Sequence, residues 1–294
     1  MSGITLFFLF LFGIAIGSFL NVVSLRYVEG EMLFKRTGGR SHCMHCGTTL
    51  RWYELIPLIS FLLQRGKCRS CREKLTWQYP VVELLSGLIF VLVPYFLMAR
   101  FSLVHSTYIL AILWVLALMT LLTMSLIDLR LQIIPDGLTL FLCGVGVCSV
   151  LYYHFCTQFG EPFGRSAVVG TSLGSYASVF SLSSNPFFTT LYGVLFGLLF
   201  LGGLYVMTRG RGIGFGDVKL AGALGLLMGW PDIACVLMLA FIFGAGVSIP
   251  LMLFRKKGIK DAVPFGPFIA LAVVVVFFFG YHIINAYFTL FKLV

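Results

Sequence analysis

The sequence predicts an all-α polytopic membrane protein with about eight transmembrane helices and a small cytosolic loop domain. Of its 294 residues, 59% are hydrophobic and only 11% are charged, which leaves too few polar side chains for the surface of a soluble domain. The apolar runs are continuous rather than alternating, which excludes a β-barrel. Most of them approach the roughly 20 residues that a helix needs to cross a bilayer.

Eight apolar runs are expected to form the membrane helices. The sixth is short and glycine-rich and the last is long enough to tilt, so we expect about seven to nine spans. The first run lacks the basic start of a signal peptide and carries Asn21 and Arg26 after its apolar core, so it is expected to be retained. The predicted spans are Ile4–Val23, Val81–Ala99, Leu103–Ile127, Gly137–Tyr153, Pro186–Met207, Asp217–Trp230, Ile233–Phe254 and Pro264–Phe291.

The formal charge of +10 is explained by orientation in the membrane. With the N-terminus outside, 18 of the 21 Lys and Arg residues fall on the cytosolic face, ten of them between Arg26 and Gln78. Only Arg100, Arg165 and Lys292 fall outside, as the positive-inside rule requires. Membrane lipids therefore account for the charge, and no nucleic-acid partner is predicted.

Three segments are expected along the chain: residues 1–25 as the first transmembrane helix, 26–79 as a cytosolic four-cysteine domain, and 80–294 as the main membrane domain. A domain of about 50 residues buries too little apolar surface to fold securely alone, so a metal or a neighbouring surface should stabilise it. The nearly uncharged stretch from His154 to Asn185 is expected to be an outer loop.

Four cysteines in the predicted cytosolic domain form two C-x-x-C pairs, Cys43 with Cys46 and Cys68 with Cys71. Four thiolates suit tetrahedral zinc, with His42 and His45 as alternative ligands beside the first pair. Two disulfides or a redox pair are the competing interpretation, but a reducing cytosol disfavours stable disulfides. A zinc ion held by four cysteines has a structural role, because no position stays open for water. The remaining cysteines are expected to be packing residues.

The chain has only 11 acidic residues, and two of them lie at the ends of predicted spans. Asp128 ends the third span and Asp217 opens the sixth, so both fall on the cytosolic side in the predicted topology. A carboxylate at membrane depth is costly unless it is paired or functional. Two that meet can share a proton, so that one activates water as a base while the other donates as an acid.

Structural roles compete with catalysis at both positions. Asp128 could pair with Arg130, and Asp217 could cap its helix or pair with Lys219. The glycines that precede Asp217 allow a close backbone approach, but the segment lacks the Gly-Lys-Ser/Thr ending of a phosphate-binding P-loop. Asp136 is expected to cap the fourth span, and the role of Glu83 is open.

Six stretches, in order along nearly the whole chain, resemble the type IV prepilin peptidases, a family of bifunctional leader peptidases and N-methyltransferases. They are Gly17–Val23 with Arg26, the two C-x-x-C pairs, Tyr79–Pro80 with Glu83–Leu85, Asp128 through Asp136, Gly214–Leu220, and Pro264–Pro267. The chain departs from the family pattern where Glu54 stands in place of the commoner Asn and where the proline expected soon after Arg26 is missing. Neither departure touches the aspartates.

The resemblance implies that Asp128 and Asp217 form the catalytic pair of a membrane aspartyl protease in the bacterial inner membrane. It implies a cytosolic zinc-binding loop, and a prepilin or pseudopilin substrate whose basic leader precedes a long apolar helix. It further implies methylation of the new N-terminal amine with S-adenosylmethionine, for which Gly66 and Lys67 are candidate contributors. The alternatives left open are a peptidase without methyl transfer, a proton-coupled transporter, and a zinc-ribbon adaptor.

Overall fold

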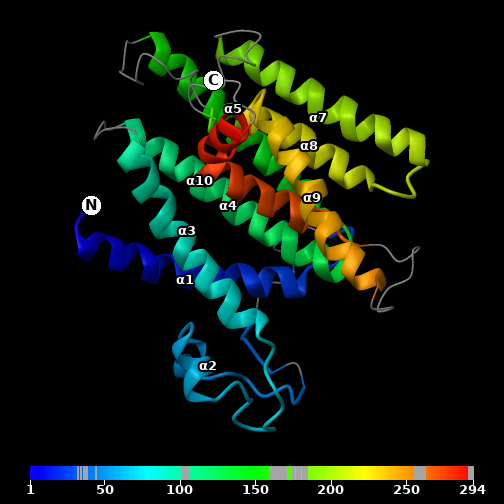
Figure 1. Cartoon of the computed structure of the whole chain (residues 1–294). Coiled ribbons are helices and arrows are strands. Elements are labelled where there is room, and N and C mark those ends of the chain that lie inside the picture. Colours follow the sequence, from blue (N-terminus) through cyan, green and yellow to red (C-terminus); the bar gives the residue numbers. More distant parts are fainter. Residues whose placement is uncertain are drawn as a thin grey trace. The chain divides into compact units, whose positions relative to one another are not determined.

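A computed structural model shows a helical membrane protein (Figure 1). It describes residues 1–31, 33, 35, 39–43, 45–100, 106–158, 171–173, 176, 180, 185–253 and 263–290. Seven helices in these ranges are long and apolar enough to cross a membrane, which confirms the predicted fold class. They are α1 (Gly3–Arg26), α3 (Gln78–Arg100), α4 (Ser106–Leu131), α5 (Asp136–Gln158), α7 (Pro186–Thr208), α9 (Asp232–Leu253) and α10 (Gly266–Leu290).

The sixth predicted span is the short helix α8 (Phe215–Met228), which has 14 residues. At 1.5 Å per residue it is about 21 Å long, shorter than the roughly 30 Å hydrocarbon core. Ten of its residues are buried, and it packs against α5 and α7. Just beyond its end, the Trp230 N–H donates to the Thr189 carbonyl in the first turn of α7 at 2.9 Å. Neighbouring helices therefore surround α8, so protein rather than lipid covers most of its surface.

Two predictions reach residues outside the described part of the chain. The outer loop expected from His154 to Asn185 is described only at its first residues, which continue α5, at 171–173, 176 and 180, and at its last residue. The predicted spans that begin at Leu103 or end at Phe254 and Phe291 also reach residues that are not described, as does the basic run 255–260.

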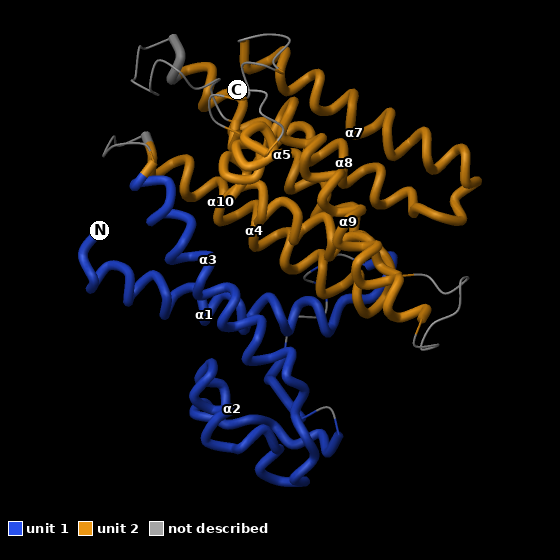
Figure 2. Tube along the Cα trace, viewed as in Figure 1, with its two compact units in different colours: residues 1–99 blue, residues 100–294 orange. Residues whose placement is uncertain are grey.

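The chain divides into two compact units, Met1–Ala99 and Arg100–Val294 (Figure 2). The first contains α1, α3, the 3₁₀ turn η1 (Trp52–Leu55), the short helix α2 (Ile59–Leu63) and the cysteine pairs. The second contains α4, α5 and α7–α10. The finer division at residues 25 and 79 stays a prediction.

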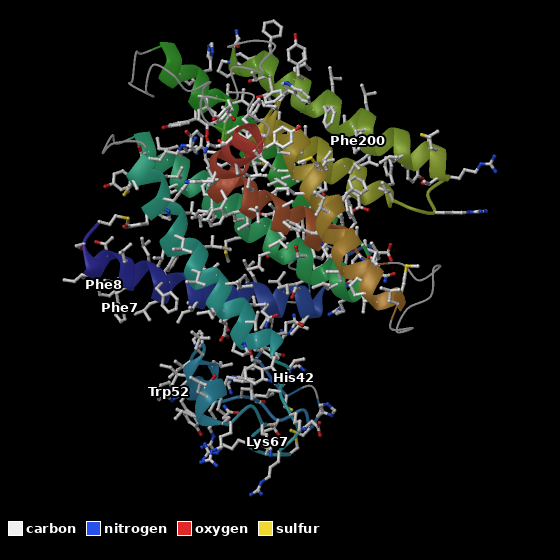
Figure 3. The ribbon with its side chains drawn as sticks, viewed as in Figure 1. Phe7, Phe8, His42, Trp52, Lys67 and Phe200 are labelled. Carbon is white, nitrogen blue, oxygen red and sulfur yellow. The ribbon has the colours of Figure 1, made fainter. Side chains whose placement is uncertain are left out.

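Large aromatic side chains on the long helices are exposed (Figure 3). Phe7 and Phe8 on α1 are 58% and 63% exposed, and Phe200 on α7 is 41% exposed. Such exposure would be unfavourable in water but is what a lipid-facing helix surface requires. The outward faces are thus consistent with a bilayer as the solvent of these helices.

Backbone contact between α7 and α8 depends on glycine. A Cβ atom on Gly225 would lie 2.4 Å from the Gly193 carbonyl oxygen, and one on Gly193 would lie 2.6 Å from the Gly229 carbonyl carbon. Small residues at these positions let two helices approach without side chains between them, as is common in membrane bundles.

We expect Gly225→Ala to destabilise the protein by about 1–3 kcal/mol, because the added methyl group must displace backbone rather than a flexible side chain. Gly144→Ala on α5 is the matched control, since a Cβ at that glycine meets nothing within 4 Å. Thermal unfolding of the two variants in the same detergent measures the difference. Equal melting temperatures would contradict the packing described here.

Candidate active site and metal centre

Asp128 lies in the last turn of α4 and is only 4% exposed. Its Oδ2 accepts a hydrogen bond of 3.0 Å from the backbone N–H of Gly266, the first residue of α10. A Cβ atom on Gly266 would lie 2.7 Å from this oxygen, so glycine permits the approach. The unpaired N–H groups and positive dipole end of a helix favour an anion, so the start of α10 holds the carboxylate in place.

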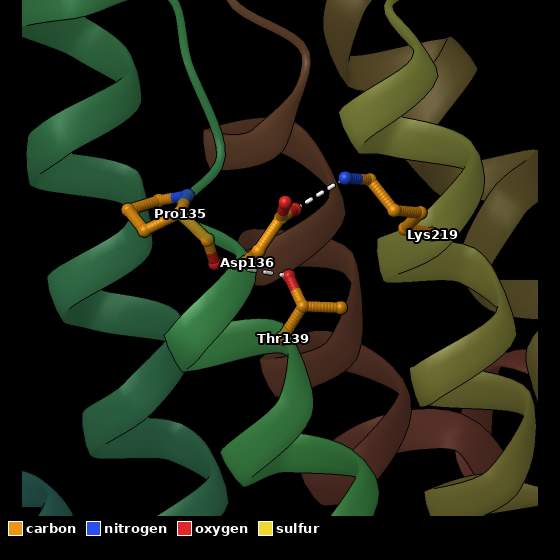
Figure 4. Close-up of polar contacts among 4 residues, drawn as sticks. All are labelled: Pro135, Asp136, Thr139 and Lys219. Atoms are coloured by element: carbon orange, nitrogen blue, oxygen red, sulfur yellow. Dashed lines mark hydrogen bonds and ion pairs between the residues drawn. The ribbon is translucent and has the colours of Figure 1, made fainter. Parts of the chain in front are cut away.

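Asp217 lies in the first turn of α8 and is 8% exposed. Its Oδ2 accepts the backbone N–H of Gly214 at 3.1 Å, so the carboxylate does cap the start of its helix. The expected alternative of an ion pair with Lys219 is not what forms. Lys219 instead pairs with Asp136 at the start of α5 (Figure 4).

Asp136 was expected to cap α5. It is the first residue of that helix, 77% of its side chain is exposed, and its carboxylate accepts the Lys219 ammonium group. This ion pair joins the start of α5 to the start of α8, the same helix end that carries Asp217. Gly216 lies against Ile134, just before Asp136, so the connection from α4 to α5 also packs on the start of α8.

The two predicted catalytic aspartates both belong to the second unit, Asp128 at the end of α4 and Asp217 at the start of α8. The Asp128 carboxylate is near enough for its charge to act on Asp217. Among the described residues each carboxyl group uses only Oδ2 in a hydrogen bond to the protein. Oδ1 of each aspartate is therefore left for water or substrate.

A third buried aspartate, Asp232, was not singled out by the sequence and is bound differently. It begins α9 and is 1% exposed. The Thr171 hydroxyl donates to Oδ1 at 2.5 Å and the Ser172 N–H donates to Oδ2 at 2.6 Å. Because both oxygens are satisfied, Asp232 anchors residues 171–173 to α9. Burial alone does not distinguish the aspartates, but hydrogen bonding does.

The four cysteines of the two C-x-x-C pairs form one cluster in the first unit. Their Sγ atoms all lie within 4.8 Å of one another, and Sγ of Cys43 is 3.9 Å from Sγ of Cys71. In a tetrahedral site with Zn–S bonds of about 2.3 Å, the sulfurs are about 3.8 Å apart. Cys46 Sγ and the Thr48 hydroxyl are also hydrogen-bonded at 3.3 Å. The cluster therefore fits zinc.

The two C-x-x-C turns have the same backbone geometry. The Cys43 carbonyl accepts from the Gly47 N–H and the Cys68 carbonyl accepts from the Arg72 N–H, each at 2.9 Å. The residue that follows each second cysteine has positive φ, 68° at Gly47 and 59° at Arg72. Each pair is flanked by an isolated antiparallel bridge, His42 with Thr49 and Lys67 with Lys74. The module is thus built from two copies of one metal-binding turn.

The other residues proposed for this module lie outside the sulfur cluster. The exposed His42 ring interacts through Nδ1 with the Arg40 carbonyl at 3.2 Å, and within the described residues neither His42 nor His45 joins the cluster. Gly66 has a φ of 66° and donates to the Phe61 carbonyl. Lys67 is exposed next to Cys68 (Figure 3). Their assignment to methyl transfer stays a prediction.

Fold and site together define a multi-pass α-helical membrane protein with two buried, electrostatically interacting aspartates and a separate four-cysteine module. Residues 11–97 match the family model of the bacterial peptidase A24 N-terminal domain, and residues 114–249 match that of the type IV leader peptidase family. No solved structure shows a significant match to the chain.

Relatives align with almost the whole chain. The prepilin leader peptidase/N-methyltransferase of Burkholderia pseudomallei strain 1026b is 32% identical over 305 residues, which cover 95% of this chain and 87% of that protein. The enzyme of the same name from Aeromonas hydrophila is 33% identical over 95% of this chain and 92% of its own length. That from Legionella pneumophila is 26% identical over 94% and 92%, respectively. The chain belongs to the prepilin leader peptidase/N-methyltransferase family.

Proposed function

We propose that this protein cleaves the basic leader from type IV prepilins or pseudopilins and then methylates the new N-terminal amine. Family membership across nearly the whole chain supports both activities. The observation that carries the peptidase assignment is the pair Asp128 and Asp217, each fixed through one carboxylate oxygen and close enough to interact electrostatically.

In the proposed reaction the two carboxyl groups share one proton and hold a water molecule between them. The ionised aspartate removes a proton from this water as it attacks the peptide carbonyl, while the protonated one donates to the carbonyl oxygen. The tetrahedral diol then collapses and the leader leaves, without a covalent enzyme intermediate. The Gly214 and Gly266 N–H groups stabilise the ionised forms and fix the two side chains.

We propose that the protein lies in the bacterial inner membrane and that its site faces the cytosol, because this orientation places most basic residues inside. The basic loop repels a basic leader, so recognition would depend on the apolar pilin helix and small side chains near the scissile bond. The four cysteines would hold a structural zinc, and S-adenosylmethionine would supply the methyl group.

Incubation of the purified enzyme with a prepilin and a labelled methyl donor tests both activities together. Mass measurement of the product should give a shortened chain whose N-terminal residue carries one added methyl group. Cleavage without the added mass would show that the protein is a peptidase without methyltransferase activity. No cleavage, combined with pH-driven flux in proteoliposomes, would favour a transporter that uses the same carboxylates.

We expect Gly266→Ala to lower the cleavage rate by about 10-fold or more, because a displacement of a catalytic group by about 1 Å can cost 100-fold. The added methyl group would meet Asp128 Oδ2 at 2.7 Å and force the carboxylate or α10 to move. Gly246→Ala is the control, since a Cβ there meets nothing within 4 Å. Initial rates on one prepilin measure the effect, and equal rates for both variants would show that Gly266 does not position Asp128.

A further inference from the structure

The first unit buries a carboxylate that proteolysis does not use. Glu83, in the second turn of α3, is 5% exposed. Its Oε2 accepts a hydrogen bond from the Leu58 N–H at 2.7 Å, and the Ser18 side chain lies near its carboxyl group. No Lys, Arg or His in the described part of the chain forms an ion pair with Glu83. An ionised carboxylate that is buried without a cation is costly, so it is stabilised either by protonation or by a bound cationic group.

An unused hydrogen-bond donor lies in the same interface. Asn21 is fully buried, and its Oδ1 accepts from Gln78 Nε2 at 2.8 Å. Its Nδ2 is the one buried side-chain polar atom in the described residues that has no hydrogen-bond partner. Such groups are rare in folded proteins and call for an explanation.

The helix periodicity places the two groups near each other. Ser18 and Asn21 lie three residues apart on one face of α1. Ser18 lies near Glu83 and Asn21 accepts from Gln78, and both of these residues lie in the first two turns of α3. The helices approach closely here, since a Cβ on Gly17 would lie 1.7 Å from Ser86 Oγ. The Glu83 acceptor and the free Asn21 donor therefore lie in the same interface between α1 and α3.

The backbone at Leu58 marks the same place as unusual. Leu58 has a φ of 61° and a ψ of −50°, a combination outside the three regions that L-residues favour, and its N–H donates to Glu83. Strained residues of this kind persist where the surroundings hold them, and they cluster at functional sites. Through this hydrogen bond, Glu83 connects the segment between the two C-x-x-C pairs to α3.

We propose that Glu83 and Asn21 bind an α-ammonium group together with its neighbouring carbonyl or carboxylate oxygen. Glu83 takes the ammonium group, and Asn21 Nδ2 donates to the oxygen. The inference rests on the proposed methyl transfer, whose two reactants both carry this chemistry: the new N-terminal residue of the cleaved pilin and the methionine end of the methyl donor.

The competing role for Glu83 is purely structural, as an acceptor that fastens Leu58. Glu83→Gln distinguishes the structural role from the binding role, because glutamine keeps an oxygen for the Leu58 N–H but cannot carry a negative charge. Glu29→Gln makes the same change at an exposed position of the same unit and serves as the control. Asn21→Leu is a second variant that removes the free donor, although leucine is larger and no longer accepts the hydrogen bond from Gln78.

The test is ligand binding to the full-length enzyme in detergent. One pair of probes is a peptide with a mature pilin N-terminus, with its amine free or acetylated. The other is S-adenosylhomocysteine and methylthioadenosine, which lacks the amino-acid end. Glu83→Gln should weaken binding of the free-amine peptide, of S-adenosylhomocysteine, or of both by 10-fold or more, without affecting the probe that lacks the amine.

The probes that lose affinity identify which reactant binds at Glu83. Loss confined to the peptide assigns the site to the pilin amine, and loss confined to S-adenosylhomocysteine assigns it to the donor. Unchanged binding of both amine probes by Glu83→Gln and by Asn21→Leu overturns the proposal, provided that wild-type enzyme methylates pilin in the same preparation. If wild-type enzyme cleaves but does not methylate, the proposed methyl transfer fails instead. Zinc content and prepilin cleavage report whether each variant is folded.

Discussion

Asp217→Asn is expected to abolish prepilin cleavage, with a loss of at least about 1,000-fold, while the protein remains inserted and folded. Asparagine has nearly the same shape, and its side-chain oxygen can still accept the Gly214 N–H that Asp217 accepts at 3.1 Å. What it cannot do is ionise or share a proton with Asp128. The substitution therefore removes acid–base chemistry while preserving the hydrogen bond that caps α8.

Asp128→Asn should have the same effect, and the double variant should be no worse than either single one, because two groups that act as a unit are not additive. Asp136→Asn is the matched control. It changes a 77%-exposed aspartate in the same unit, whose ion pair with Lys219 is worth at most about 1 kcal/mol. Cleavage rates of a prepilin at equal enzyme concentration measure all four variants, and normal processing by Asp217→Asn would refute the aspartyl mechanism.

The helix ends that carry the two aspartates were predictable from sequence. With so few acidic residues in the chain, each carboxylate at the end of an apolar run is informative, and the direction of successive spans predicts that Asp128 and Asp217 lie on one face. The short α8 was also foreseeable, because its run is brief and rich in glycine. Both inferences need only composition and alternation along the chain.

Long-range backbone contacts could not be predicted in this way. The Gly266 N–H reaches Asp128 across 138 residues, and no local pattern indicates which helix start will meet which carboxylate. The stretch Pro264–Pro267 was noted for its family resemblance, but its role emerges only when α10 packs against α4. Asp232 was missed for the same reason, since its partners Thr171 and Ser172 lie 61 and 60 residues away.

The second large expected effect is the loss of zinc from the four-cysteine module. We expect the double substitution Cys43→Ser and Cys68→Ser to eliminate about one bound zinc per chain and to unfold the module, because structural zinc contributes about 10–16 kcal/mol in small domains. Cys43 and Cys68 are the buried members of the two pairs. Metal analysis of purified protein gives the zinc content, and limited proteolysis between residues 39 and 78 reports loss of order. Cys148→Ser, at an exposed cysteine outside the cluster, should change neither.

Zinc and disulfides predict opposite responses to two reagents. A zinc-bound module should lose its protease resistance in a strong chelator and keep it in dithiothreitol, and a disulfide-bonded module should do the reverse. The 3.9 Å separation of the Cys43 and Cys71 sulfurs is nearly twice the roughly 2.05 Å length of a disulfide and matches two ligands of one tetrahedral ion. Protease resistance that survives the chelator, or full zinc content in the double variant, would show that the two matching turns are held together by something other than a metal.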